Sequence, residues 1–335
     1  MYRFIRPLLF QLDPEDAHRF TLWLLNQVGQ MRFPLKILEN MYSAPNHPVE
    51  IFGLTFKNPI GLAAGYDKDG MAVPGLSALG FGHIEIGTIT PQPQEGNPKP
   101  RIFRLIEDQA VINRMGFPGN GADFTVRQLS GKHKSSSTIL GVNLGKNKDT
   151  PLERSAEDYI DLMRKFAPLA NYLTINISSP NTVGLRRLQG RQMLKDLLDA
   201  ISIERKNLPG KIPMLVKLAP DLEDEELEDA LDVILDTDMD GIVATNTTLA
   251  RPSLRSGSAA ETGGLSGSPL RKISLKMLEK IIKKVDGRIP VVSSGGVMTP
   301  ADARQRLEAG AALVQIYTGL VYQGPGLVRN ILKSL

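Results

Sequence analysis

The chain of 335 residues contains no cysteine, four histidines and a single tryptophan. Without cysteine it can form no disulfide, no thiolate metal ligand and no cysteine nucleophile or base. His18, His47, His83 and His133 are not spaced like a metal-binding pair, so we expect no metal site. The net charge is only +4, and no Lys/Arg block interleaved with aromatic residues is present, so we expect no nucleic-acid partner.

Long apolar runs are also missing. No segment approaches the ~20 apolar residues of a membrane-spanning helix, and the amino terminus lacks the continuous apolar core that a signal peptide needs. With 41% hydrophobic and 23% charged residues, the composition is that of a globular protein with a large core.

Residues 1–45 are unusually apolar for the edge of a globular domain, and they predict a helical N-terminal extension. Asp13-Pro14 is typical of an N-cap followed by a first-turn proline, and the helix it opens extends to about Gly29. A second helix is expected at about 34–42. Their apolar residues cover more than one face. This favours either a patch lying in a membrane surface or a helical cap packed on the rest of the chain or on a dimer partner.

Residues 46–335 alternate predicted strands with predicted helices, which indicates parallel strands joined by right-handed crossovers. Eight repeats predict one closed (β/α)8 TIM barrel, with an open doubly wound sheet as the alternative. A long excursion at about 90–137 contains a predicted antiparallel pair, 101–105 with 110–112, and is typical of a pocket wall or lid. The strands are predicted within 58–65, 82–88, 138–143, 172–177, 213–218, 241–245, 290–294 and 312–317.

The segment Thr174–Asn181 is the clearest functional signal. A β-branched apolar strand ends there in two asparagines, two serines and a proline. The same pattern recurs at the other strand ends, where catalytic residues of such barrels gather. Because these residues are all uncharged or cationic, they predict a pocket for a polar, anionic ligand. They are Ala64 and Lys68, Thr88, Asn143, Asn176 with Ser179, Lys217, Thr245-Asn246-Thr247, Gly295-Gly296, and Tyr317-Thr318.

The last two strand ends indicate a phosphate. Gly295-Gly296 lies between a strand and a helix that begins at Pro300, so its backbone N–H groups can face an anion, and the turn after Tyr317 repeats this arrangement. Lys217 is flanked by apolar residues, which predicts burial. A buried lysine needs an anionic partner, and a reduced flavin ring is one such group.

Seven segments in consistent order resemble dihydroorotate dehydrogenases, over the chain from about residue 50 to its end. Ser179, where another class has cysteine, and the helical extension resemble the membrane-associated, quinone-dependent class 2. Tyr66, Val183 and Ser293-Ser294 depart from the usual pattern. The segments are Gly61–Lys68, Asn113–Phe117, Asn176–Thr182, Val216–Asp221, Ala244–Thr248, Gly263–Gly267 and Gln315–Gly319.

The resemblance implies an FMN-dependent oxidoreductase that oxidises dihydroorotate to orotate in pyrimidine biosynthesis. Ser179 would take a proton from substrate C5 while a hydride passes from C6 to flavin N5, under a lid formed by 180–187. It implies substrate contacts from Lys68, Asn113, Arg114, Met115, Gly116, Phe117, Asn176, Asn181, Asn246 and Thr247. It implies cofactor contacts from Ala64, Gly65, Lys68, Thr88, Asn143, Asn176, Lys217, Thr245, Gly267, Gly296, Tyr317 and Thr318.

The resemblance also implies membrane quinone as the final electron acceptor. The apolar N-terminal helices would then form a tunnel to the flavin, which favours the membrane interpretation of residues 1–45. His18 and Arg104 are candidate quinone contacts. The expected location is peripheral, on the cytoplasmic face of the cell (inner) membrane.

Two other functions compete with this one. Another FMN barrel, such as a 2-hydroxy-acid oxidase or a dihydrouridine synthase, would share the phosphate loops but would lack the asparagine-rich pocket. A membrane-peripheral binding protein without catalysis is the second alternative. The presence of Ser179, Lys68 and all four pocket asparagines argues against it.

Overall fold

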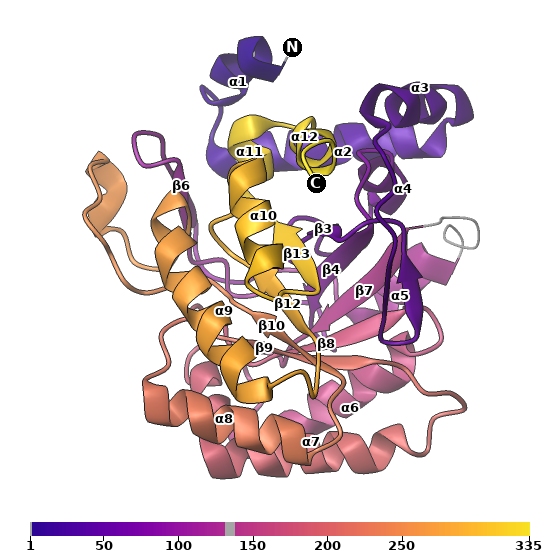
Figure 1. Ribbon diagram of the computed structural model, residues 1–335, viewed down its shortest axis with the longest axis vertical. Helices are drawn as coiled ribbons and strands as arrows, with labels where there is room; N and C mark the ends of the chain where they lie inside the picture. The colour runs from indigo at the N-terminus through magenta and orange to yellow at the C-terminus, as the bar shows by residue number, and fades with distance from the viewer. Residues whose placement is uncertain (1, 131–137) are drawn as a thin grey trace.

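The computed structural model describes residues 2–130 and 138–335; residue 1 and residues 131–137, which include His133, lie outside the described residues. Its centre is a closed barrel of eight parallel strands in chain order (Figure 1). The predicted (β/α)8 barrel is therefore confirmed, and the open sheet is excluded. The strands are β3 (Ile60–Leu62), β4 (His83–Ile89), β7 (Ile139–Leu144), β8 (Tyr172–Asn176), β9 (Met214–Leu218), β10 (Gly241–Ala244), β12 (Val291–Ser294) and β13 (Leu313–Ile316).

Amphipathic helices cover the outside of the barrel. In α7 (Arg191–Arg205), the residues Leu194, Leu197, Leu198 and Ile201 recur at helical spacing and pack into the main core. The short helix α11 after β13 was not predicted. The remaining helices and 3-10 turns around the barrel are α4 (Val73–Ser77), α5 (Ala122–Ser130), η1 (Leu152–Arg154), α6 (Ser155–Phe166), η2 (Leu185–Gln189), α8 (Asp224–Asp236), η3 (Gly257–Ala260), η4 (Ser268–Leu270), α9 (Arg271–Val285), α10 (Pro300–Glu308), α11 (Thr318–Gln323) and α12 (Leu327–Leu332).

Two small antiparallel sheets accompany the barrel. The hairpin of β1 (Val49–Ile51) and β2 (Leu54–Phe56) packs Phe56 against buried residues at the amino ends of the barrel strands. The predicted pair in the excursion is confirmed as β5 (Ile102–Leu105) and β6 (Ala110–Asn113). A third strand, β11 (Gly264–Gly267), pairs with β6 and is not among the strands predicted from the sequence, because a glycine-rich run shows no strand pattern.

Three helices precede the barrel: α1 (Tyr2–Leu9), α2 (Pro14–Gln30) and α3 (Arg32–Tyr42). The two predicted helices are confirmed as α2 and α3, and α1 is an additional one. The side chain of Asp13 caps α2 by accepting from the amide of Glu15 (2.8 Å), as its sequence predicted. Figure 1 shows these helices at one end of the molecule, beside α11 and α12.

Directed polar contacts fix this extension to the barrel. Glu15 forms a two-fold ion pair with Arg101 (2.8 and 3.0 Å), and both side chains are largely buried. Burial alone would raise the pKa of Glu15, but its bonds with Arg101 and the charge of Lys99 outweigh this and lower it. None of the helices in the described ranges is long and apolar enough to cross a membrane.

Candidate active site

The carboxyl ends of the barrel strands enclose one cavity. The space between its walls, including its opening, amounts to about 1130 Å³. None of the described residues that line it is acidic, as an anionic ligand requires. The predicted site residues that line it are Ala64, Gly65, Lys68, Thr88, Asn113, Met115, Gly116, Phe117, Asn176, Ser179, Asn181, Lys217, Thr245, Asn246, Thr247, Gly267, Gly296, Tyr317 and Thr318.

Hydrogen bonds join the asparagines at the strand ends into a chain. Asn176 Nδ2 donates to Asn143 Oδ1 (2.9 Å), and Asn176 Oδ1 accepts from Ser178 Oγ (3.0 Å) and from Asn246 Nδ2 (3.3 Å). The Asn246 amide also donates to Ser178 Oγ (2.9 Å). Each amide therefore has a fixed orientation, and the chain presents a defined pattern of donors and acceptors to a ligand.

The buried carboxylate of Glu85 lies at the lower end of this chain. One of its oxygens accepts from Asn143 Nδ2 (2.8 Å). The other accepts from Tyr172 (3.1 Å) and Thr174 (3.2 Å) on β8 and from Gln315 (2.8 Å) on β13. Because Asn143 donates its NH2 group to Glu85, its amide oxygen faces the other way, where it accepts from Thr88 and Asn176.

Two lysines supply positive charge to the cavity. Lys217 is 5% exposed, as predicted, and it forms no ion pair with the part of the chain that the structure describes. Its burial lowers its pKa, while the charge of Glu85 acts in the opposite direction. Lys68 donates to the carbonyl of Gly65 (2.8 Å), and desolvation lowers its pKa to about 8. Both ammonium groups therefore suit an anionic ligand.

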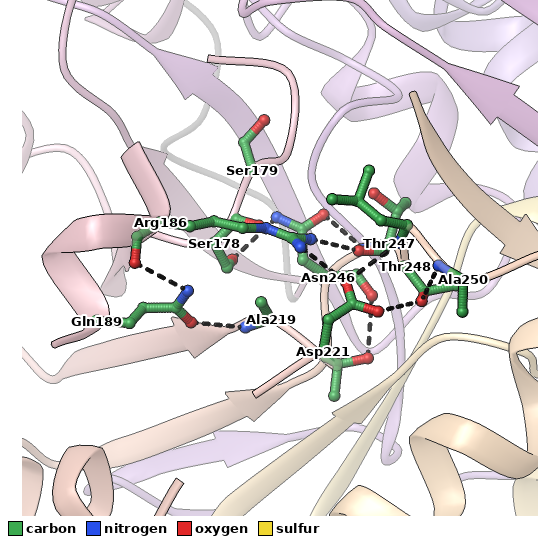
Figure 2. Close-up of polar contacts among 12 residues, drawn as sticks. Ser178, Ser179, Arg186, Gln189, Ala219, Asp221, Asn246, Thr247, Thr248 and Ala250 are labelled. Carbon is green, nitrogen blue, oxygen red and sulfur yellow. Dashed lines mark hydrogen bonds and ion pairs between the residues drawn. The ribbon is translucent and has the colours of Figure 1, made fainter. Parts of the chain in front are cut away.

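Ser179 lies at the edge of the cavity in the loop that follows β8. Its hydroxyl oxygen accepts from the backbone amide of Asn181 (3.2 Å), the one hydrogen bond that it makes within residues 2–130 and 138–335. Figure 2 shows its side chain pointing away from the polar network around Arg186 and Asp221. The hydroxyl proton thus remains available for a ligand or a water molecule.

The predicted lid, residues 180–187, is held against the loops after β9 and β10 (Figure 2). Arg186 pairs with Asp221 (2.7 Å) and donates to the carbonyl groups of Ser178 (3.0 Å) and Thr247 (2.9 Å). Gln189 accepts from the amide of Ala219 (2.9 Å). These contacts tie the segment to the loops at the carboxyl ends of β9 and β10.

Glycines form the predicted phosphate end of the cavity. Gly267, Gly295 and Gly296 have φ values of +94°, +104° and +74°, which L side chains rarely adopt. A Cβ atom on Gly296 would lie 2.3 Å from the Cα of Arg271, and one on Gly267 would lie 2.3 Å from the carbonyl oxygen of Gln109. Only glycine therefore fits at these positions.

A second cavity, of about 1190 Å³ and mostly apolar, lies between α1, α2, α3 and the barrel. Ile102, Val111 and Tyr317 line both cavities, so the two are neighbours. His18 and Arg104, the candidate quinone contacts, line the apolar one. Burial lowers the pKa of His18 to about 3, so this imidazole is neutral at pH 7.

Two predicted site residues do not line the main cavity. Asn143 lies beneath it and accepts from Thr88 (2.6 Å). Arg114 turns outward, where it pairs with Glu261 (2.6 Å) and stacks on Phe103. Sequence reasoning also missed several lining residues, of which some directly precede or follow predicted ones and could have been found that way: Ser266, Ser294, Gln315 and Gly319.

Comparisons with known proteins agree with this geometry. The family model described as dihydroorotate dehydrogenase matches residues 47–335. The chain belongs to the dihydroorotate dehydrogenase family. A relative from Idiomarina loihiensis named dihydroorotate dehydrogenase (quinone) is 46% identical over the full length of both chains. One of the same name from Yersinia enterocolitica is also 46% identical, over all of this chain and 99% of the relative. These full-length matches make the chain a class 2 member.

Solved dihydroorotate dehydrogenase structures share the fold. The structure of DHODH from Eimeria tenella in complex with ferulenol has a TM-score of 0.89 and 40% identity, and the match covers 98% of this chain and 93% of that one. The ligand-free type from the same organism has a TM-score of 0.87 and 42% identity, over 96% and 93%. The N-terminal helices are therefore part of the shared fold.

Proposed function

We propose that this protein is a quinone-dependent dihydroorotate dehydrogenase, an oxidoreductase of pyrimidine biosynthesis. The observation that carries the proposal is the single cavity at the strand ends, where Ser179, Lys68 and the pocket asparagines meet glycines suited to a phosphate. The full-length similarity to relatives named dihydroorotate dehydrogenase (quinone) supports it. The second candidate, another FMN barrel, is not supported, because the family model and the asparagine chain both favour dihydroorotate dehydrogenase.

The cavity fits FMN as the cofactor. Lys217 offers a buried charge without a partner among the described residues, and Gly295 and Gly296 leave room for a phosphate close to the backbone. Tyr317 and Thr318 would hold the same end, while Thr88, Asn176 and Thr245 would border the ring. Bound FMN would supply the two-electron acceptor that the side chains cannot provide.

The chain's own residues would bind and orient dihydroorotate. Lys68 would attract the substrate carboxylate, and the fixed amides of Asn113, Asn176, Asn181 and Asn246 would pair with the edges of the pyrimidine ring. Ser179 would accept the C5 proton while its own hydroxyl proton passes to a water molecule, since the amide that points at its oxygen favours developing negative charge there. The latched lid would exclude water.

Quinone would reach the cofactor through the apolar cavity between the N-terminal helices. Neutral His18 and the guanidinium of Arg104, which donates to the carbonyl of Leu9 (3.2 Å), would contact its polar end. Residues 1–45 would thus act as a membrane-contacting unit and residues 46–335 as the catalytic barrel. The proposed location is peripheral, on the cytoplasmic face of the cell membrane.

Anaerobic reduction tests this function. The purified protein is mixed with dihydroorotate, and the 450 nm flavin absorbance is followed. Fast bleaching is expected for the wild type. Bleaching slower by about 10²–10⁴-fold is expected for Ser179→Ala with flavin still bound, because a positioned base contributes that much.

The neighbouring Ser178→Ala serves as the matched control, because its hydroxyl belongs to the asparagine chain. It should weaken substrate binding more than it slows bleaching at saturation. Equal rates in wild type and Ser179→Ala would remove Ser179 as the base. Bleaching by a 2-hydroxy acid but not by dihydroorotate would favour the second candidate.

A further inference from the structure

Arg306, on α10, is the largest fully buried side chain among the described residues, with 0% of its surface exposed. It lies next to the glycine loop at the phosphate end but does not line the cavity. A buried guanidinium is costly unless its charge and its N–H groups are satisfied. The groups around Arg306 must therefore satisfy its charge and its N–H groups.

The contacts of Arg306 satisfy only part of the group. Its Nη2 atom donates to the carbonyl oxygen of Arg271 (2.7 Å), to Ser274 Oγ (2.8 Å) and to the carbonyl oxygen of Gly295 (3.2 Å). Its Nε and Nη1 atoms are buried without a partner in the described part of the chain. No carboxylate pairs with it there, because Asp302 is occupied by Arg271 and by the amides of Met298 and Thr299.

The partners of Nη2 belong to the wall of the phosphate end. Gly295 lines the cavity. So do Leu270, which precedes Arg271 in the chain, and Gly296, which lies against Arg271. Since Arg306 stands behind this wall, the carbonyl groups of Gly295 and Arg271 point toward it and away from the cavity. Ser274 reinforces this by donating to the same Gly295 oxygen (2.9 Å). A partial negative charge is thereby kept away from an incoming phosphate.

We propose that Arg306 is a positioning residue for the phosphate of the cofactor. It holds the carbonyl groups of Arg271 and Gly295 away from the cavity. It also places a positive charge without an ion pair behind the loop that the phosphate would contact. The inference rests on the proposed function, because it assumes that FMN occupies the cavity. Asp302 and Glu279 act on this charge only from a distance, without an ion pair among the described residues, and a phosphate across the loop would add an anion.

Burial lowers the pKa of Arg306 to about 10, which leaves the group charged at pH 7. If Arg306 served only to connect the neighbouring loops, it would need hydrogen-bond donors but no charge. The two roles therefore differ in whether a neutral donor can replace the guanidinium, and in whether the phosphate of the ligand matters.

Flavin exchange separates these roles without emptying the site. The full-length, flavin-loaded protein is equilibrated with mixtures of FMN and riboflavin, and the bound flavins are quantified after removal of the free ones. The ratio gives the preference for the phosphate-bearing ligand. Arg306→Met removes charge and donors, Arg306→Gln keeps donors without charge, and Arg306→Lys keeps the charge.

Arg306→Met and Arg306→Gln should each lower the preference for FMN by about tenfold or more, whereas Arg306→Lys should stay within about threefold of the wild type. Arg304→Met is the matched control, because Arg304 lies on the same helix but is exposed, and its one bond to the described residues goes to the carbonyl of Ser334. It should leave the ratio unchanged. If the Met variant fails to melt cooperatively, the Gln variant carries the comparison.

An unchanged ratio in the Gln or Met variant would overturn the inference, and so would an equal loss in the Lys variant. A wild type that binds FMN and riboflavin equally would instead count against the proposed cofactor itself. The two failures are distinguishable because the second appears before any substitution is made.

Discussion

At the scale of single residues, Glu85 sets the direction of the hydrogen bonds beneath the pocket. Its carboxylate accepts from Asn143, whose oxygen then accepts from Thr88 and Asn176. A glutamine at position 85 could turn its own NH2 group toward Asn143 and reverse the chain up to Asn246. The asparagines could then present two different patterns of hydrogen-bond donors and acceptors to a pyrimidine.

We therefore expect Glu85→Gln to weaken orotate binding by about tenfold or more, the equivalent of one charge-assisted hydrogen bond. Binding to the oxidised protein is measured from the change in flavin absorbance. Tyr172→Phe is the control, because it removes one hydrogen bond to the same carboxylate (3.1 Å) and leaves the asparagines in place. Similar losses in both variants would contradict the directional role.

Lys68 gives a prediction for pH. Desolvation lowers its pKa to about 8, so the ammonium group is charged below pH 8 and loses its proton as the pH rises through that value. Orotate affinity should be constant from pH 6 to 7.5 and should fall by about tenfold per pH unit above 8.

Lys68→Arg tests the assignment, since a guanidinium stays charged over this range. Its orotate affinity should not decline between pH 8 and 10, even if it is lower throughout. A wild-type affinity that stays flat to pH 10 would show that the charge of Lys68 does not hold the substrate.

The sequence predicted the buried Lys217 but not Glu85, because a sequence shows local patterns and not contacts between distant strands. Lys217 stands out because it is a cation inside an otherwise apolar strand near a strand end. Glu85 lies in mid-strand, and its four partners come from three other strands that are distant in sequence. Such a partnership exists only once the barrel closes, so neither periodicity nor a local motif can show it.

At the scale of elements, Arg186 latches the lid. Its pair with Asp221 joins residues 180–187 to the loop after β9, and both side chains are mostly buried. Asp221 also accepts from Thr248 and from the amide of Leu249 (3.1 Å), so it connects the latch to the loop after β10 (Figure 2).

Asp221→Asn should loosen this latch, because it removes the charge that Arg186 contacts. Release of orotate, followed by stopped-flow flavin absorbance, should become about tenfold faster. Asp224→Asn, which breaks an exposed pair with Lys280, should leave the release rate unchanged. Unchanged release in Asp221→Asn would mean that opening of this lid does not limit the exit of the product.

The success of the sequence prediction for elements follows from their patterns. The eight barrel strands are rich in buried apolar and β-branched residues and are bounded by polar turns, and their order fixes the topology. In contrast, β11 is built of glycine and short side chains and is defined only by its pairing with β6, and α1 contains Pro7, which argues against a helix locally. Both depend on tertiary contacts rather than on local propensity.

At the scale of the whole molecule, the N-terminal helices are bound to the barrel on one face and expose apolar side chains on another. Tyr2 donates to the carbonyl of Val321 (2.6 Å), and Glu15 pairs with Arg101. Phe4 is 82% exposed and Phe33 is 76% exposed, an arrangement typical of a helix that lies in a membrane surface. A cap buried against the barrel alone would not leave these residues in contact with water.

Trp23 allows this surface to be tested, because it is the only tryptophan in the chain and is 56% exposed on α2, stacked with Phe20. Phospholipid vesicles containing anionic lipid should shift its fluorescence to shorter wavelength, since indole rings settle at the membrane interface. The double variant Phe4→Ser/Phe33→Ser should bind the vesicles about tenfold or more weakly, because two large apolar side chains no longer enter the lipid. Val183→Ser, which removes an apolar residue that is 88% exposed on the lid, should bind like the wild type. Equal binding by all three proteins would place the membrane contact elsewhere.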